Sequence, residues 1–266
     1  MRLLIINPNT SADVTELIRA EAQRSAGPDT ELTVQTAPYG MEYIETRLES
    51  LIAAGAVAEV IAAHAGEVDG IVVAAFGDPG MPALKELVDV PVIGITEAAL
   101  CAAALQGQRF SIIAISDRIT AWYRECVEGF GLAGRLASIR SLTQALGGIG
   151  SVQQDFGPAL VALAQQAVAE DGADVIILAG APLAGLAREV ADRIPVPVVD
   201  GIGAGVRLAE AVVGLASGTH RAGSFAPPPR KPRRGLSPAL DCALDRAQSA
   251  ADDTTDTATH ISEGGE

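Results

Sequence analysis

The sequence reads DGIVVAAFGDP at residues 69–79 and DVIILAGAP at residues 174–182. Each stretch is a short apolar run that starts at an aspartate and ends in a Gly/Pro turn signal, as is typical of a strand buried on both faces of a parallel sheet. Each is followed by a helical pattern and then by Val-Pro-Val, at residues 90–92 and 196–198. The two stretches therefore mark the same position in two copies of one β/α unit.

The repeat extends to the first strand of each half. RLLIIN at residues 2–7 matches RFSIIA at residues 109–114, and all the correspondences share an offset of about 105 residues. Chance similarity between alanine-rich segments would rarely keep one offset at three separate places. We therefore predict an α/β fold of two pseudo-twofold-related lobes, each with a parallel four-stranded sheet, around a central crevice.

Short apolar runs alternate with longer amphipathic stretches along the chain, as in a series of βα units. The predicted strands are residues 3–7, 32–37, 70–76, 90–95, 110–116, 137–142, 175–180 and 196–200. The predicted helices are residues 12–23, 48–65, 98–105, 121–130, 157–169 and 204–215. We expect a first lobe of residues 1–96 plus about 203–217, a second lobe of residues 97–202, a carboxyl-terminal arm of residues 218–243 and a disordered acidic tail of residues 244–266.

The composition is that of a soluble globular protein, with 48% hydrophobic residues in a chain of 266 and a formal net charge of −14. Such acidity argues against a nucleic-acid-binding surface. No apolar run in the sequence is long enough to cross a membrane. The three cysteines have no CxxC spacing and indicate neither a disulfide framework nor a zinc cluster. We expect a cytoplasmic homo-oligomer that holds no metal.

The carboxyl ends of both predicted sheets border the crevice, and open α/β sheets bind ligands beyond those ends. The residues that we expect to bind a ligand there are Asn7, Asn9, Thr10, Pro38, Phe76, Gly77, Ser116 and Ala181. Thr10 and Asp13 have the spacing of a capping box that opens a helix. Free backbone N–H groups at such a helix start would face a ligand carbonyl or carboxylate.

Further motifs lie at the ends of the predicted strands. They are INPNT at residues 6–10, FGDPG at 76–80, PVIGI at 91–95, the strand end at 177–183, PVVDG at 197–201 and FAPPP at 225–229. Together they resemble the Asp/Glu/hydantoin racemase superfamily, and within it the hydantoin and allantoin racemases, over about residues 1–240. The resemblance implies cofactor-independent racemisation of a small amino-acid derivative by two cysteines, one from each lobe. One thiolate removes the proton from the stereocentre and the other thiol delivers a proton from the opposite face.

The chain departs from the family pattern at both of these positions. The resemblance places the first cysteine at Ala75 and the second at Gly180, and neither residue has a side-chain proton to transfer. The protein either does other chemistry in the same crevice, or binds without turnover, or has been altered at these two positions. If catalysis persists, we expect Asp78 to accept the proton, with Ser116 or Asn9 orienting the ligand; alternatively, Asp78 forms an Asx turn that shapes its loop.

The remaining candidate residues have structural interpretations. We expect Cys101 and Cys126 to pack in the core as small hydrophobic residues. Glu97 and Asp200 each stand next to a predicted helix start, where a cap or hydrogen-bond anchor is expected. The glycines that start at Gly201 do not match a dinucleotide fingerprint, because the third glycine comes one residue too early. We therefore expect no cofactor and a small amino-acid derivative as the partner; whether the protein is an enzyme stays open at this point.

Overall fold

A computed structural model describes residues 1–215 and 222–249 of the chain. Within these residues there are two four-stranded sheets with equivalent strand orders, β2-β1-β3-β4 and β6-β5-β7-β8, and every strand pairing is parallel. The strands are β1 (Arg2–Asn7), β2 (Glu31–Thr36), β3 (Gly70–Val73), β4 (Val92–Gly94), β5 (Phe110–Ala114), β6 (Leu136–Ser141), β7 (Val175–Leu178) and β8 (Val198–Asp200). The matching orders confirm the predicted α/β fold of two repeated lobes.

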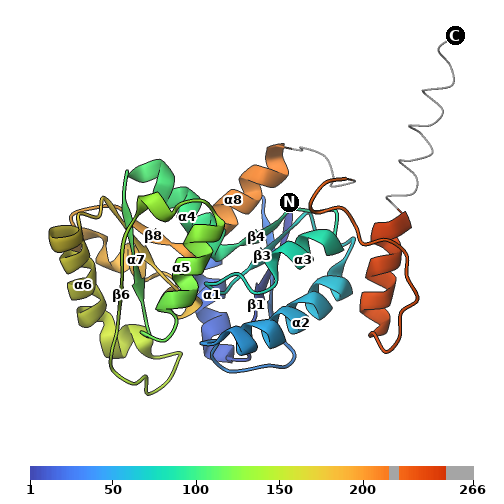
Figure 1. The fold of residues 1–266 in the computed structure, drawn as a ribbon, viewed down its shortest axis with the longest axis horizontal. Helices are drawn as coiled ribbons and strands as arrows, with labels where there is room; N and C mark the ends of the chain where they lie inside the picture. Colours follow the sequence, from blue (N-terminus) through green and yellow to red (C-terminus); the bar gives the residue numbers. More distant parts are fainter. Residues whose placement is uncertain (216–221, 250–266) are drawn as a thin grey trace, which may run out of the picture.

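Helices pack on the sheets of both lobes (Figure 1). They are α1 (Ala12–Ser25), α2 (Arg47–His64), α3 (Met81–Leu87), α4 (Ile95–Gln106), α5 (Thr120–Gly129), α6 (Val152–Asp171), α7 (Leu186–Val190) and α8 (Gly201–Leu215). Three short 3-10 turns lie at Ala133–Arg135, Ala181–Leu183 and Ala191–Arg193. Helix α8 follows the last strand of the second lobe and packs against α1, α4 and β3, so the chain returns to the first lobe. We propose the lobe boundaries of the sequence analysis on this basis.

The central strands are buried on both faces, which explains their unbroken apolar runs. In β1, Leu3 and Ile5 belong to the core cluster that includes α1 and α8. Leu4 and Ile6 belong to the opposite cluster, formed with α2 and α3, because successive strand side chains point to opposite faces. The first cluster also contains Ile113 and residues of α6. The two lobes therefore share a continuous apolar core on one side.

The predicted strands and helices agree with the structure except at some of their first and last residues. Strands β3 and β7 end at Val73 and Leu178, before the predicted ends, because the chain leaves each sheet there to form the loops between the lobes. Helix α4 begins at Ile95 rather than at the predicted residue 98. Helices α3 and α7 are the helical segments expected before the two Val-Pro-Val motifs, but their bounds were not predicted, because 7 and 5 residues are too few to establish a 3.6-residue period.

Residues 222–249 lie in and beyond the predicted carboxyl-terminal arm, and residues 238–249 are helical. This helix lies at the outer side of the first lobe, near α2 and α3 (Figure 1), where Ala243 joins their apolar cluster. The helix continues past residue 243, where Ala247 and Gln248 are buried as well, so the prediction that a disordered tail starts at residue 244 is wrong for residues 244–249. The part of the predicted acidic tail beyond residue 249 lies outside the described residues.

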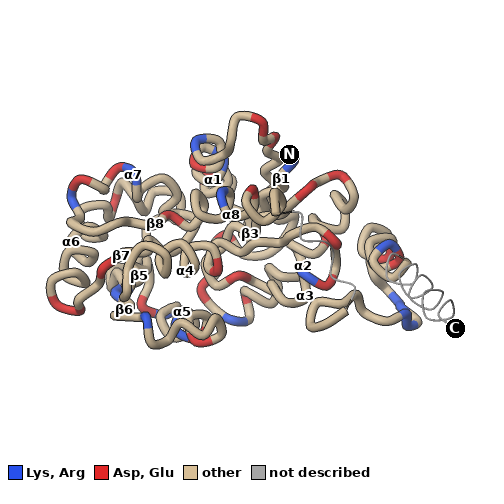
Figure 2. The backbone as a smooth tube through the Cα atoms, turned by 90° about the horizontal axis from the view of Figure 1, so that it is seen from above, with Lys and Arg blue, Asp and Glu red and all other residues tan. Residues whose placement is uncertain are grey.

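Acidic and basic residues are interspersed along both lobes (Figure 2). Among the helices of the described residues, none has both the length and the apolar character that a membrane span requires. In the same part of the chain, His, Cys, Asp and Glu side chains do not gather in groups of three or more that could hold a metal ion.

Candidate functional site

A small cavity lies between the carboxyl ends of the two sheets. Its lining residues are Asn9, Tyr43, Ile44, Ala74, Ala75, Phe76, Ile115, Tyr123, Gly180, Ala181 and Pro182. Ala75 follows β3 of the first lobe and Gly180 follows β7 of the second, so both lobes contribute to one cavity. The volume is about 30 Å³, far below the roughly 300–1,000 Å³ of an ordinary ligand pocket. The space between the lobes in this structure is therefore smaller than a ligand of ordinary size.

Gly180 and Ala75 differ in their backbone conformation. Gly180 has φ 112° and ψ 142°, a region that residues with a Cβ atom avoid. An added Cβ would meet Pro182 Cδ at 3.5 Å, an ordinary contact distance. Backbone conformation rather than lack of space therefore favours glycine at position 180.

Two buried asparagines build the turn after β1. Asn7 Nδ2 donates a hydrogen bond to Asn9 Oδ1 at 2.9 Å, and Asn9 Oδ1 also accepts one from the Ser11 N–H at 2.9 Å. The residue that caps α1 is Ser11, so the predicted capping box of Thr10 with Asp13 is wrong. Asn9 lines the cavity, whereas Asn7 supports the turn without lining it.

Three other predicted ligand-binding residues lie away from the cavity lining. Thr10 and Pro38 are exposed. The Thr10 N–H donates to the Met41 carbonyl at 3.0 Å and so holds the segment between β2 and α2. Ser116 Oγ donates to Glu45 Oε1 at 2.6 Å. Because Ser116 follows β5 and Glu45 precedes α2, this hydrogen bond joins the two lobes beside the cavity.

The loop after β3 packs closely against α5. The Phe76 and Tyr123 rings lie 4.7 Å apart between centroids, and both residues line the cavity, as does the predicted Ala181. Gly77 does not line it; an added Cβ there would lie 2.3 Å from the Trp122 ring. The positive φ of Gly77, 109°, and its close approach to Trp122 explain why glycine stands at this position.

The Asp78 carboxylate binds the start of α4. Its Oδ1 and Oδ2 accept hydrogen bonds from the Thr96 and Glu97 N–H groups, each at 2.9 Å. Burial outweighs these two donors and raises the pKa of the Asp78 carboxyl to about 7. Asp78 does not line the cavity. Glu97 is confirmed as an anchor, because it accepts the Gly94 N–H at 3.0 Å and pairs with Lys85 at 2.8 Å.

The two helical cysteines differ in exposure. Cys101 is exposed, so the prediction that it packs in the core is wrong; it lies on the outer side of α4, as does Leu105, which is 84% exposed. Cys126 is partly buried, and its Sγ lies 3.9 Å from the Gly77 carbonyl oxygen. Burial raises the pKa of the Cys126 thiol to about 12. This thiol stays protonated at neutral pH and does not line the cavity.

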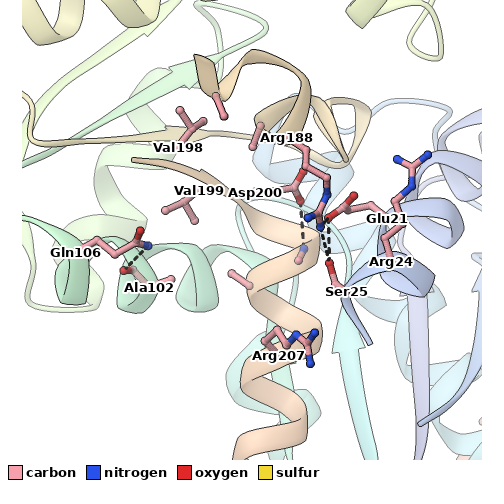
Figure 3. Close-up of a pocket in the computed structure, with 14 residues that line it drawn as sticks. Glu21, Arg24, Ser25, Ala102, Gln106, Arg188, Val198, Val199, Asp200 and Arg207 are labelled. Carbon is pink, nitrogen blue, oxygen red and sulfur yellow. Dashed lines mark hydrogen bonds and ion pairs between the residues drawn. The ribbon is translucent and has the colours of Figure 1, made fainter. Parts of the chain in front are cut away.

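A larger cavity of about 470 Å³ lies where α1, α4, α7 and α8 meet (Figure 3). Arg188 donates there to Glu21 Oε1 at 2.6 Å, and this ion pair joins the second lobe to the first. Asp200 is confirmed as an anchor, because it accepts the Gly185 N–H at 2.6 Å and the Ile202 N–H at 2.8 Å. The predicted ligand-binding residues do not line this cavity. Its polar groups hold the lobes together.

Sequence reasoning missed the two tyrosines at the cavity between the lobes. Tyr43 lies in the segment between β2 and α2, where no periodicity indicates which side chains turn inward. Tyr123 lies on a helix whose amphipathic pattern marks it as buried without indicating that its ring reaches a cavity. The one usable signal was that the segment with Tyr43 follows the carboxyl end of a strand, the edge at which ligands bind.

Comparisons with known proteins agree with this architecture. A family model described as Asp/Glu/Hydantoin racemase matches residues 3–209. A hydantoin racemase of Paenarthrobacter aurescens is 36% identical over 236 residues, which cover 87% of this chain and 99% of the relative. The structure of an allantoin racemase from Klebsiella pneumoniae superposes with a TM-score of 0.86 at 34% identity, covering 90% of this chain and 98% of the other. That of an allantoin racemase from Pseudomonas fluorescens gives 0.82 at 35% identity, covering 89% and 100%.

Proposed function

This chain belongs to the Asp/Glu/hydantoin racemase family, and we propose that it binds a small amino-acid derivative of the hydantoin type between its lobes without racemising it through thiols. The observation that carries the proposal is that Ala75 and Gly180 line one cavity from opposite lobes. These are the positions at which the resemblance puts the two cysteines of the family. The cavity thus keeps the place for a ligand while presenting a methyl group and a hydrogen atom where two proton-transfer groups are needed.

Two-base racemisation requires an acceptor and a donor on opposite faces of the stereocentre. At the cavity, the polar side chains are those of Asn9, Tyr43 and Tyr123, and the Asn9 amide only donates and accepts hydrogen bonds. Burial raises the pKa of both tyrosines above the ordinary value, so neither supplies a phenolate at neutral pH. The polar groups of the cavity are therefore suited to hydrogen-bonding a ligand, which supports binding without turnover.

A second candidate function is an enzyme that uses a carboxylate in place of the thiols. The pKa of Asp78, raised to about 7 by burial, favours it, because a general base works best with a pKa near the ambient pH. The two backbone N–H groups that occupy its oxygens disfavour it. Full turnover by an Asp78→Asn variant would remove this candidate.

The two candidates differ in the fate of a single hydantoin enantiomer in D₂O. We expect 5-methylhydantoin to raise the midpoint of thermal unfolding of the protein. Optical rotation should decay, and deuterium should enter at the stereocentre, no faster than in buffer alone. Decay and exchange above the buffer rate would establish an enzyme and contradict the proposal of binding alone.

We also propose that the protein is cytoplasmic and homo-oligomeric. The three free cysteines support a reducing compartment. Light scattering on the purified full chain measures the oligomeric state. A monomer at all concentrations tested would contradict the proposed homo-oligomer.

A further inference from the structure

The Tyr43 hydroxyl oxygen is buried, and it has no hydrogen-bond partner within the described residues. The Tyr43 ring packs against the core cluster, while the residue lines the cavity between the lobes. Buried hydroxyl groups in folded proteins are normally paired, since an unpaired one loses its bonds to water without replacing them. The protein therefore leaves this hydroxyl free to bond to a molecule that enters the cavity.

We propose that Tyr43 provides the hydrogen bond that positions the ligand in this cavity, and that the ligand presents an uncharged ring N–H or carbonyl to it, as a cyclic ureide does. This inference rests on the proposed function, because it assumes that the ligand binds between the lobes. It adds Tyr43 as a residue that determines ligand specificity, a role separate from that of the two missing thiols.

The charges near Tyr43 decide which ligand group it accepts. The Glu45 and Glu49 carboxylates lie close enough to act on the Tyr43 hydroxyl, and they raise its pKa together with burial. Glu45 is held by Ser116 Oγ, and Glu49 by the N–H groups of Glu45 and Thr46. A ligand carboxylate at this end would meet two like charges, whereas a neutral ureide would not. The site therefore favours hydantoins over amino acids with an acidic side chain.

The chemistry of phenol suits such a ring. The Tyr43 hydroxyl can donate to a ring carbonyl or accept from a ring N–H. It stays protonated at neutral pH, because its pKa lies above the usual range. The hydrogen bond between Tyr43 and the ligand should therefore not depend on pH, as long as the protein is folded and the hydantoin is uncharged.

Tyr43 belongs to a segment that contacts both lobes. On one side Thr10 holds Met41, and on the other Glu45 binds Ser116 and Arg47 pairs with Glu125. The segment thus covers the cavity and is tied to the second lobe by polar side-chain contacts. A ligand that reaches Tyr43 displaces no protein partner of its hydroxyl, since within the described residues it has none.

Replacement of Tyr43 by phenylalanine tests the proposal, with Tyr39→Phe as the matched control. Tyr39 lies in the same segment and is 48% exposed. Without ligand, Tyr43→Phe should leave the thermal midpoint unchanged or raise it, because no protein hydrogen bond is lost. With 5-methylhydantoin, calorimetry should give affinity lower by about three- to tenfold than wild type. Tyr39→Phe should change neither quantity.

Four results would overturn the inference. A lower midpoint for ligand-free Tyr43→Phe would mean that the hydroxyl has a protein partner. Unchanged affinity of Tyr43→Phe, with the wild type binding 5-methylhydantoin, would refute Tyr43 alone and leave the proposed function standing. Wild-type affinity for L-aspartate equal to or above that for 5-methylhydantoin would refute the preference for an uncharged ring. If the wild type binds neither compound, the proposed function fails and this inference with it.

Discussion

Gly180 and Ala75 line one cavity, yet only Gly180 has a backbone that requires glycine. At φ 112°, a residue with a Cβ atom at position 180 is strained in its backbone, although the surrounding space would accommodate the Cβ atom. A thiol at position 180 therefore needs a different local backbone from the one in this structure. Reintroducing a thiol at Ala75 carries no such requirement, since Ala75 is not among the residues with positive φ.

The Gly180→Ala variant measures this backbone term. We expect it to lower the free energy of unfolding by about 1–3 kcal/mol. Gly134→Ala is the matched control, because a Cβ atom at Gly134 would meet no steric clash either, and Gly134 has no positive φ. Its free energy of unfolding should stay the same or rise by up to about 1 kcal/mol. Equal effects of the two variants in urea unfolding would contradict the assignment.

Asp78 makes the stability of the protein depend on pH. Its pKa is about 7 in the folded protein against the ordinary 3.8, so between these values the folded state holds a proton that the unfolded chain has lost. This contribution is full below about pH 4 and is lost as the pH rises through about 7. The stabilisation is therefore present at acidic pH and absent at pH 8.

An Asp78→Asn variant lacks this titration. From about pH 5 to pH 8 the wild type should lose roughly 3 kcal/mol more free energy of unfolding than the variant does. Urea unfolding across this range measures the difference, and Asp200 titrates in both proteins and cancels. Parallel pH profiles would show that the Asp78 pKa is not raised.

Among elements, α4 shows what sequence patterns can and cannot predict. Its apolar spacing located the helix, and the Glu97 anchor was predicted from its place next to the helix start. The three earlier residues of the helix depend on Asp78, which comes from the preceding loop. A cap supplied by a residue distant in sequence leaves no local pattern, so the helix start was predicted too late.

Glu97 also links α3 to α4 through Lys85, and the exposed fractions of these side chains are 14% and 21%. Glu97→Ala should lower the free energy of unfolding by about 1–3 kcal/mol, because it leaves a largely buried ammonium and the Gly94 N–H without their partner. Glu16→Ala removes an ion pair in which Glu16 is 70% exposed. This variant should change the free energy of unfolding by less than about 0.5 kcal/mol. Similar losses in both variants would refute the distinction.

For the whole molecule, the offset repeat was enough to predict two lobes with equivalent sheets, because the buried central strands leave the same apolar runs in both halves. It was also enough to predict that Asn9, Phe76 and Ala181 reach the edge between the lobes. Tyr43 and the Arg188–Glu21 pair were beyond prediction, since they depend on how irregular segments and separate lobes pack together. The position of Pro38 and Thr10 after predicted strands places them at the cavity in the sequence analysis, but in the structure both residues are exposed.

The crystal structure of the protein with 5-methylhydantoin tests the central claim most directly. The account predicts the ring between Ala75 and Gly180, with the Tyr43 hydroxyl within hydrogen-bond distance of a ring N–H or carbonyl. A ring bound in the larger cavity where α1, α4, α7 and α8 meet, with the space between the lobes still closed, would contradict it.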